Sequence, residues 1–174
     1  MEAFRSSNNR SGFTLIELIT GMLVISVIFS AVAGIISTSV QSMDTIDSRK
    51  NIIIDGYYAS SKFVREFREI NEQIDVLIAD PKIARFVVDD TLVVQYELTG
   101  ELLTRLIVGN AQSQMMTNCV DVANSLFRYY DVSNNELSGI FNPITVWRGR
   151  LELTMVNKGN TIYYAADVFP ENFK

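Results

Sequence analysis

The chain has 174 residues, is 48% hydrophobic and carries a formal net charge of −5. This apolar content supports a folded core, and the acidic balance argues against a basic surface, so no nucleic-acid partner is expected. The chain has no histidine and one cysteine, Cys119, which excludes an internal disulfide, a zinc ribbon and histidine-dependent catalysis. We therefore expect neither an enzyme nor a bound cofactor.

The N-terminal segment changes abruptly from polar to apolar. Residues 1–12 are polar and contain Arg5 and Arg10, whereas no charged residue occurs between Leu18 and Met43. A helix rises about 1.5 Å per residue, so this stretch is long enough to cross a hydrocarbon core of about 30 Å. The two arginines precede the stretch and two aspartates follow it, and positive charge favours the cytoplasmic side. The sequence predicts one membrane span with everything after residue 43 outside the cytoplasm.

Two simpler readings of this segment fit less well. A secretory signal peptide has a shorter apolar region, of about 7–15 residues, followed by a cleavage site with small residues. Here the small residue, Gly12, precedes the apolar block. A plain anchor leaves Glu17 unexplained, because a carboxylate inside an apolar segment is costly unless it has a partner.

A short motif lies between the basic leader and the apolar helix: Ser11-Gly12-Phe13-Thr14-Leu15-Ile16-Glu17. In this context it resembles the cleavage signal of type IV prepilins and type II secretion pseudopilins. The resemblance implies that a prepilin peptidase cuts between Gly12 and Phe13 and that the new amino group of Phe13 is N-methylated. It also implies storage in the inner membrane, followed by assembly with other pilin or pseudopilin subunits through the N-terminal helix.

Cleavage would create a positive amine at the end of an apolar helix, close to the carboxylate of Glu17. Two charges that are costly alone in a medium of low dielectric can neutralise each other when paired. In the family that the signal resembles, this pairing sets the register between neighbouring subunits, a role we assign to Glu17. The alternative is that Glu17 snorkels toward the membrane edge.

After Met43 the chain becomes amphipathic. Apolar residues recur with helical spacing at Phe63, Phe67, Ile70, Ile74 and Leu77, and Ile46, Ile53 and Tyr57 extend this stripe upstream. We expect the stripe to pack on the protein's own sheet. Asp80-Pro81 predicts the end of the helix, because the residue before proline disfavours helical geometry. The expected segments are a leader (1–12), a transmembrane or filament-core helix (13–43), an amphipathic helix (44–79) and an extracytoplasmic β-rich pilin domain (80–174).

Downstream the apolar period changes from helical spacing to two, which indicates strands. The expected strands are Leu92–Leu98, Leu102–Val108, Ser125–Val132, Ile144–Trp147, Leu151–Val156 and Thr161–Val168. Turn residues at Thr99-Gly100 and at Lys158-Gly159 predict that the strands on either side of each form a hairpin. A loop is expected at 109–114. A bulge or bend is expected at Gly149, because the alternation of apolar and polar residues changes phase there. The fold class is therefore α+β, with one long N-terminal helix packed on a mainly antiparallel sheet.

Oxygen-rich residues cluster at Asp89-Asp90 and at Asp131 with Asn134, Asn135 and Glu136. Their spacing matches no EF-hand loop, and turns favour Asp and Asn, so we expect neither calcium nor another metal. Cys119, without a histidine to activate it, is expected to be an idle thiol.

The order of elements loosely resembles the J-type pseudopilin of type II secretion and the PilW-type minor pilins. We therefore expect a minor pilin or pseudopilin that initiates or caps a type IV pilus or a type II secretion pseudopilus. The alternative is an uncleaved, single-pass, membrane-anchored binding module outside the cytoplasm that uses its helix only as a tether.

Overall fold

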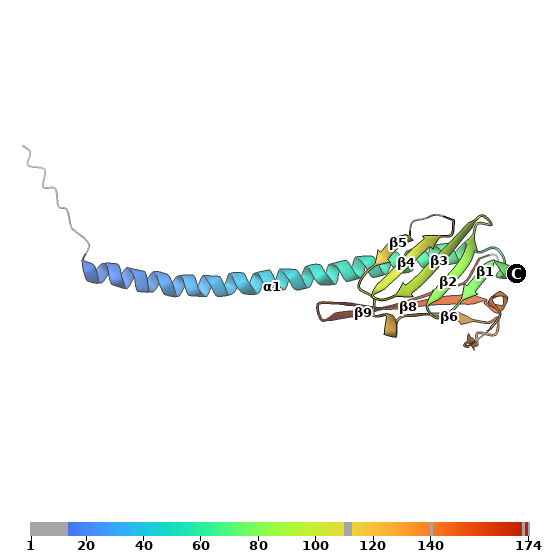
Figure 1. Cartoon of the computed structure of the whole chain (residues 1–174). Coiled ribbons are helices and arrows are strands. Elements are labelled where there is room, and N and C mark those ends of the chain that lie inside the picture. Colours follow the sequence, from blue (N-terminus) through green and yellow to red (C-terminus); the bar gives the residue numbers. More distant parts are fainter. Residues whose placement is uncertain (1–13, 110–112, 140, 172, 174) are drawn as a thin grey trace, which may run out of the picture. The chain divides into compact units, whose positions relative to one another are not determined.

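A computed structural model describes residues 14–109, 113–139, 141–171 and 173 (Figure 1). Helix α1 runs from Leu15 to Arg68. The chain divides into two compact units, with the boundary between Asp44 and Thr45. The first unit contains the N-terminal part of α1, and the second contains the rest of α1 and all of the strands.

The second unit contains two antiparallel sheets. Sheet A has the order β1-β2-β3-β4-β5, and sheet B has the order β7-β6-β8-β9. The strands of sheet A are β1 (Val76–Ala79), β2 (Ile83–Val88), β3 (Leu92–Thr99), β4 (Leu102–Ile107) and β5 (Ser113–Thr117). The strands of sheet B are β6 (Leu126–Tyr130), β7 (Glu136–Leu137), β8 (Arg148–Asn157) and β9 (Asn160–Val168). Short 3-10 helices lie at η1 (Gln73–Asp75), η2 (Val122–Asn124) and η3 (Pro143–Thr145).

The C-terminal part of α1 lies between the two sheets and provides the centre of the core (Figure 1). The ring of Phe63 is completely buried, with its centroid 5.4 Å from that of Tyr96 in sheet A and 5.4 Å from that of Phe127 in sheet B. Phe67 packs edge-on against Phe86 of β2, with centroids 5.3 Å apart. Because one helix face contacts both sheets, these aromatic contacts hold the three layers together.

A buried ion pair joins α1 to sheet A beside this aromatic cluster. The Arg105 guanidinium of β4 lies 2.8 Å from the Glu66 carboxylate, and the hydroxyl of Tyr96 donates a 2.7 Å hydrogen bond to the same carboxylate. Lys62 approaches it to 3.1 Å from one helical turn away. Burial raises the pKa of Glu66, but the hydrogen bonds from Arg105, Tyr96 and Lys62 outweigh burial and hold that pKa below its ordinary value. Glu66 is therefore a carboxylate in the folded protein.

The expected fold class is confirmed, but two expectations about the helix are wrong. α1 ends at Arg68 rather than near Ala79, because neighbouring segments cap its last carbonyls. The amide of Glu171 donates to the carbonyl of Arg68, and the amide of Asp89 donates to the carbonyl of Glu69.

The upstream part of the expected buried stripe is also out of phase. Ile46, Ile53 and Tyr57 are exposed, and the buried helix face instead runs through Ile52, Gly56 and Ala59 to Phe63. Ile74 and Leu77 lie beyond the helix end and are largely exposed. Gly56 does not interrupt α1: an added Cβ there would lie 2.3 Å from the ring of Tyr164, so this glycine allows the close packing of β9.

The hairpins β3–β4 and β8–β9 and the strand β6 are confirmed. The expected strand Ile144–Trp147 is wrong, because Pro143–Thr145 forms a 3-10 helix capped by the Asn142 side chain. Strands β1, β2, β5 and β7 were not predicted. Asp80-Pro81 lies in the turn between β1 and β2 instead of ending a helix.

The expected bulge at Gly149 is absent from the pairing of β8 with both of its neighbours. An added Cβ at Gly149 would lie 2.7 Å from the ring of Phe67. The glycine therefore makes room for an aromatic side chain of the helix.

Candidate functional site

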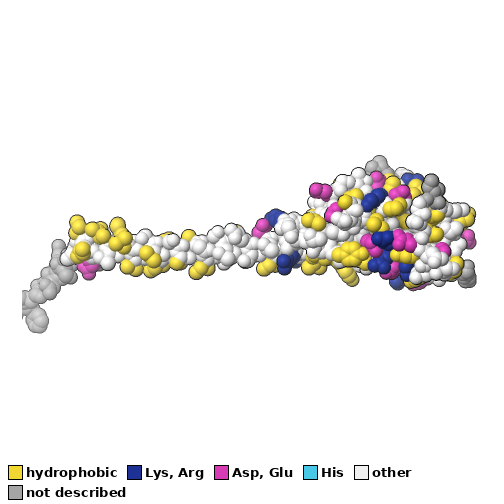
Figure 2. All heavy atoms as spheres, turned by 90° about the horizontal axis from the view of Figure 1, so that it is seen from below, with side chains coloured by type: hydrophobic (Ala, Val, Ile, Leu, Met, Phe, Trp, Pro, Cys, Tyr) yellow, Lys and Arg dark blue, Asp and Glu magenta, His cyan; other side chains and the backbone are white. Residues whose placement is uncertain are grey.

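The first unit presents an uninterrupted apolar helix surface. Every residue of α1 from Leu15 to Asp44 is exposed, and within 14–43 Glu17 is the sole charged residue (Figure 2). Among the described residues, α1 is the one helix long and apolar enough to span a membrane by length and composition. An exposed apolar surface of this extent is stable only against lipid or against other apolar surfaces.

Several hydroxyl side chains within this surface donate hydrogen bonds to backbone carbonyls of the helix itself. Thr38 donates to the carbonyl of Gly34 at 2.9 Å, Ser39 to that of Ile35 at 2.8 Å, and Ser42 to that of Thr38 at 2.9 Å. Because these bonds need no water, they lower the cost of placing the hydroxyls in hydrocarbon or between packed helices. The surface is therefore chemically suited to an environment without water.

Glu17 lies in the first turn of α1. Its backbone amide donates to Thr14 Oγ1 at 3.4 Å, and the Thr14 hydroxyl lies 3.5 Å from its carboxylate. Thr14-Leu15-Ile16-Glu17 has the T-x-x-E spacing of a helix start, a signal that the sequence analysis did not use. An acidic side chain also interacts favourably with the helix N-terminus. Glu17 therefore has a local structural role besides the register role expected for it, and its exposed carboxylate is open to a cationic partner.

The other two residues of the expected cleavage signal, Gly12 and Phe13, lie outside the described residues. The expected loop at 109–114 lies partly outside them and overlaps the start of β5.

The acidic clusters considered for calcium are turn residues. Asp89 and Asp90 have positive φ angles in the turn between β2 and β3, a geometry that Asp tolerates. The Asp131 carboxylate accepts hydrogen bonds from the amide of Asn135 at 2.8 Å and from its side chain at 3.0 Å. In the described part of the chain, no group of three or more Cys, Asp or Glu side chains is placed to hold a metal ion.

Cys119 is half-buried, and its thiol contacts the side chain of Asn118 at 3.3 Å. Burial, with smaller effects from the charges of Asp55 and Glu101, raises the pKa of this thiol. A thiol with a raised pKa stays protonated and is a poor nucleophile, so this position offers no activated cysteine.

Comparison with known protein families gives one match. The family model described as the prokaryotic N-terminal methylation motif matches residues 7–33, which include the expected cleavage site and the first half of the apolar surface. No relative among curated proteins matches the chain.

The chain thus carries a prepilin-type signal near its N-terminus and has a pilin-like α+β fold. The type IV pilins and pseudopilins that carry such a signal are structural proteins, not enzymes. The signal implies processing by prepilin peptidase and pilus assembly with other pilins, and the apolar helix implies anchoring in the inner membrane before assembly.

Proposed function

We propose that this chain is a minor pilin or pseudopilin that initiates or caps a type IV pilus or a type II secretion pseudopilus. A prepilin peptidase cleaves it between Gly12 and Phe13 and methylates the new amino group of Phe13. Before assembly the subunit sits in the inner membrane with its second unit outside the cytoplasm. The order of its strands supports a minor subunit of the J-type or PilW-type, and its single cysteine leaves no possibility of the disulfide that closes the C-terminal loop in many major pilins.

The observation that carries this proposal is the exposed apolar surface of α1, which begins within the matched segment and continues beyond it. A surface that suits lipid equally suits the packed helices of a filament, because both exclude water. A subunit can therefore move from the membrane into a filament without exposing this surface to water. Within that surface Glu17 pairs with the methylated amine of Phe13, in its own chain or in a neighbour, and this pairing offsets the cost of burying either charge.

Mass spectrometry of sheared surface filaments and of the cell envelope tests the proposal. A chain that begins at methylated Phe13 is expected in the sheared filaments for a pilus, or in filaments isolated from the cell envelope for a pseudopilus. These two kinds of filament are the assembled fractions. A chain of full mass that retains residues 1–12, and whose function survives the replacement Gly12→Val, would instead identify a tethered binding module.

The role of Glu17 is tested with variants that separate its charge from its contribution to the helix start. Glu17→Gln keeps the size of the side chain and suits the third position of the helix, but it cannot pair with the amine. Thr14→Ala removes the cap and keeps the charge, at a cost of about 0.5–2 kcal/mol of helix stability. We expect Glu17→Gln to enter the membrane normally but to fail in assembly, whereas Thr14→Ala assembles. Normal assembly of Glu17→Gln would refute the register role.

A further inference from the structure

Strand β9 is a long sheet edge with few of the features that usually protect such an edge. It pairs with β8 in unbroken register from Asn157↔Asn160 to Gly149↔Val168, and it contains no proline and no lysine. Its charged residue, Asp167, lies near the end of the strand and contacts Arg148 and Arg150 of β8. The other edges in the described part are protected: the pairings of β1 and β5 contain bulges, and β7 has two residues. Soluble proteins usually block exposed edges with such bulges, charges or short strands. The free edge of β9 is therefore available for pairing with another strand.

The register of the hairpin identifies which backbone groups of β9 point outward. Lys158 and Gly159 form a two-residue turn with positive φ angles, so the flanking pair Asn157 and Asn160 is hydrogen-bonded and alternate pairs follow it. The next pair, Val156 and Thr161, is therefore not hydrogen-bonded. In agreement, the amide of Val156 donates away from β9, to the carbonyl of Cys119. The residues of β9 whose amide and carbonyl groups face away from β8 are Thr161, Tyr163, Ala165 and Asp167.

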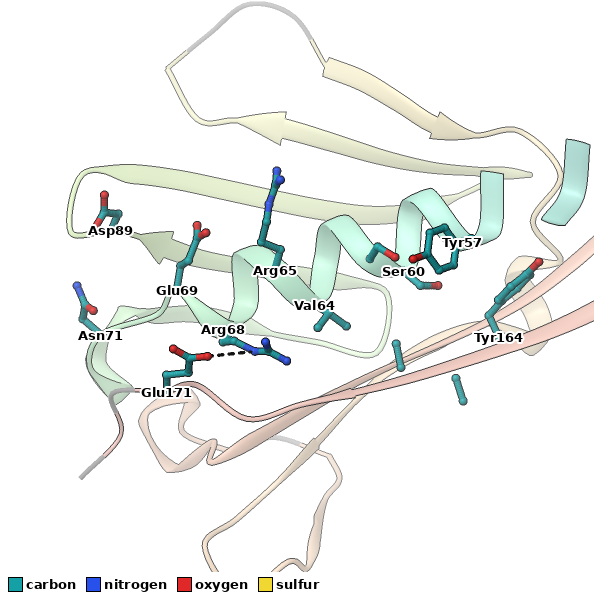
Figure 3. A pocket seen from close by; sticks show the side chains of 13 residues that line it. Tyr57, Ser60, Val64, Arg65, Arg68, Glu69, Asn71, Asp89, Tyr164 and Glu171 are labelled. Carbon is teal, nitrogen blue, oxygen red and sulfur yellow. Dashed lines mark ion pairs between the residues drawn. The ribbon is translucent and has the colours of Figure 1, made fainter. Parts of the chain in front are cut away.

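A cavity of about 730 Å³ lies beside this strand, between β9 and α1. Tyr57, Ser60 and Val64 line its helix side, and Tyr164 lines its strand side (Figure 3). A strand added to a sheet lies about 4.8 Å from its neighbour. Because the cavity is lined by both α1 and β9, it has room for the side chains of a strand added next to β9.

Two features of the cavity indicate an occupant. Ser60 is 9% exposed, and its Oγ is buried without a hydrogen-bond partner among the described residues. Such a group is costly unless something completes it. Tyr57 is 69% exposed and Ile53 is 50% exposed on the same helix, so the exposed apolar side chains of α1 continue to the rim of the cavity. These residues belong to the helix that the proposed function places against neighbouring subunits.

We propose that β9 and this cavity accept an extended segment from a neighbouring subunit, which joins sheet B as its next strand; this inference rests on the proposed function. An extended backbone matches the outward-facing amides and carbonyls, which recur at every second residue. One of its inward side chains is small and polar and forms a hydrogen bond with Ser60 Oγ, while the others are apolar and pack over Val64. An acidic side chain near Arg65 would complement that arginine, which lines the cavity without an ion-pair partner among the described residues.

A second copy of β9 does not fill the cavity. Its inward-facing Tyr164 already packs on its own α1, where its hydroxyl donates to the carbonyl of Ile53 at 3.2 Å. The donated segment is therefore one whose inward face is not already covered by its own chain, such as a loop or a terminal strand of another subunit.

Amide hydrogen exchange with single-residue resolution tests the strand addition. It compares the processed chain, residues 13–174, in detergent with the same chain in the assembled fraction. In detergent, the amides of Tyr164 and Ala166 are expected to exchange slowly, because they bond to β8, whereas those of Tyr163 and Ala165 exchange fast. On assembly, exchange at Tyr163 and Ala165 is expected to slow by about tenfold or more.

Unchanged fast exchange at Tyr163 and Ala165 in assembled material would overturn the strand addition while leaving the proposed function intact. It would mean that neighbours pack against this face through side chains alone. Absence of the processed chain from both assembled fractions would overturn the proposed function and the strand addition with it.

A proline variant provides a second, independent measurement. Ala165→Pro removes an amide that β8 does not use, and proline is tolerated at such edge positions, so the fold is expected to persist. Its incorporation into the assembled fraction is expected to fall about tenfold or more, since it removes a hydrogen bond and blocks the edge. The matched control is Val132→Pro. Val132 is exposed and is the second residue of a turn that spans Asp131 to Asn134, a position that favours proline. Incorporation of a folded Ala165→Pro variant at the level of Val132→Pro would count against the proposal; if the variant does not fold, the exchange measurement decides.

Discussion

The ion pair between Glu66 and Arg105 is the contact whose loss should most destabilise the second unit. Their side chains are 5% and 8% exposed, respectively, so the variant Glu66→Ala leaves a buried guanidinium without its partner. Breaking a buried ion pair from one side costs about 3–5 kcal/mol. The hydroxyl of Tyr96 also loses its acceptor. Because folded proteins are stable by only about 5–15 kcal/mol, this loss is a large part of the total.

The same reasoning predicts that removing both charges is far less harmful. Replacing a buried ion pair with apolar residues of similar volume is often neutral or stabilising, because neither charge then needs to be desolvated. The double variant Glu66→Leu with Arg105→Met is therefore expected to recover most of the stability lost in Glu66→Ala. Adding Tyr96→Phe removes the hydroxyl that the double variant leaves without its acceptor.

Thermal unfolding of the full chain in detergent, followed by near-ultraviolet circular dichroism, measures these differences. For a chain of this size, 1 kcal/mol shifts Tm by about 2–4 °C, so Glu66→Ala should lower Tm by about 6–20 °C. Glu69→Ala, just beyond the end of α1 and exposed, is the control and should change stability by less than about 0.5 kcal/mol. The reasoning is refuted if Glu66→Ala behaves like this control, or if the double variant is as unstable as the single one.

Two further predictions concern close packing and pH. Gly56→Ala places a Cβ 2.3 Å from the ring of Tyr164 and should destabilise the second unit by about 1–3 kcal/mol in the same unfolding assay. Adding Tyr164→Ala should relieve that clash, and a stable Gly56→Ala protein would contradict it. The pKa of Glu66 is lower in the folded protein than its ordinary value of about 4.5. The carboxylate therefore stabilises the folded protein above about pH 4.5, and this stabilisation is lost as the pH falls through the pKa of Glu66 in the folded protein. Unfolding of the wild type should therefore depend more steeply on pH below about 4.5 than unfolding of Glu66→Gln; equal slopes would show that other carboxylates dominate.

Local patterns in the sequence were sufficient for the features that depend on neighbouring residues. The apolar stretch from Leu18 to Met43 predicts a helix that suits lipid, and the segment around Glu17 predicts the prepilin-type signal, because both depend on residues a few positions apart. The β3–β4 and β8–β9 hairpins were likewise predicted, since turn residues and alternation set their register.

Contacts between distant segments decided what these patterns did not predict. α1 ends at Arg68 because the amide of Glu171, far along the chain, caps its carbonyl. The buried helix face includes Gly56 rather than Tyr57 because β9 packs closely there, and hydrophobic spacing alone does not contain that information.

The candidate site divides in the same way. The helix surface of the first unit follows from composition, because an apolar stretch needs no partner within the chain to be recognised. The free edge of β9 and the cavity beside it depend on which strands pair and where α1 lies, which only the tertiary structure decides. Glu66 and Arg105 illustrate the physical reason: two charges 39 residues apart in sequence become one buried pair only when α1 packs on sheet A.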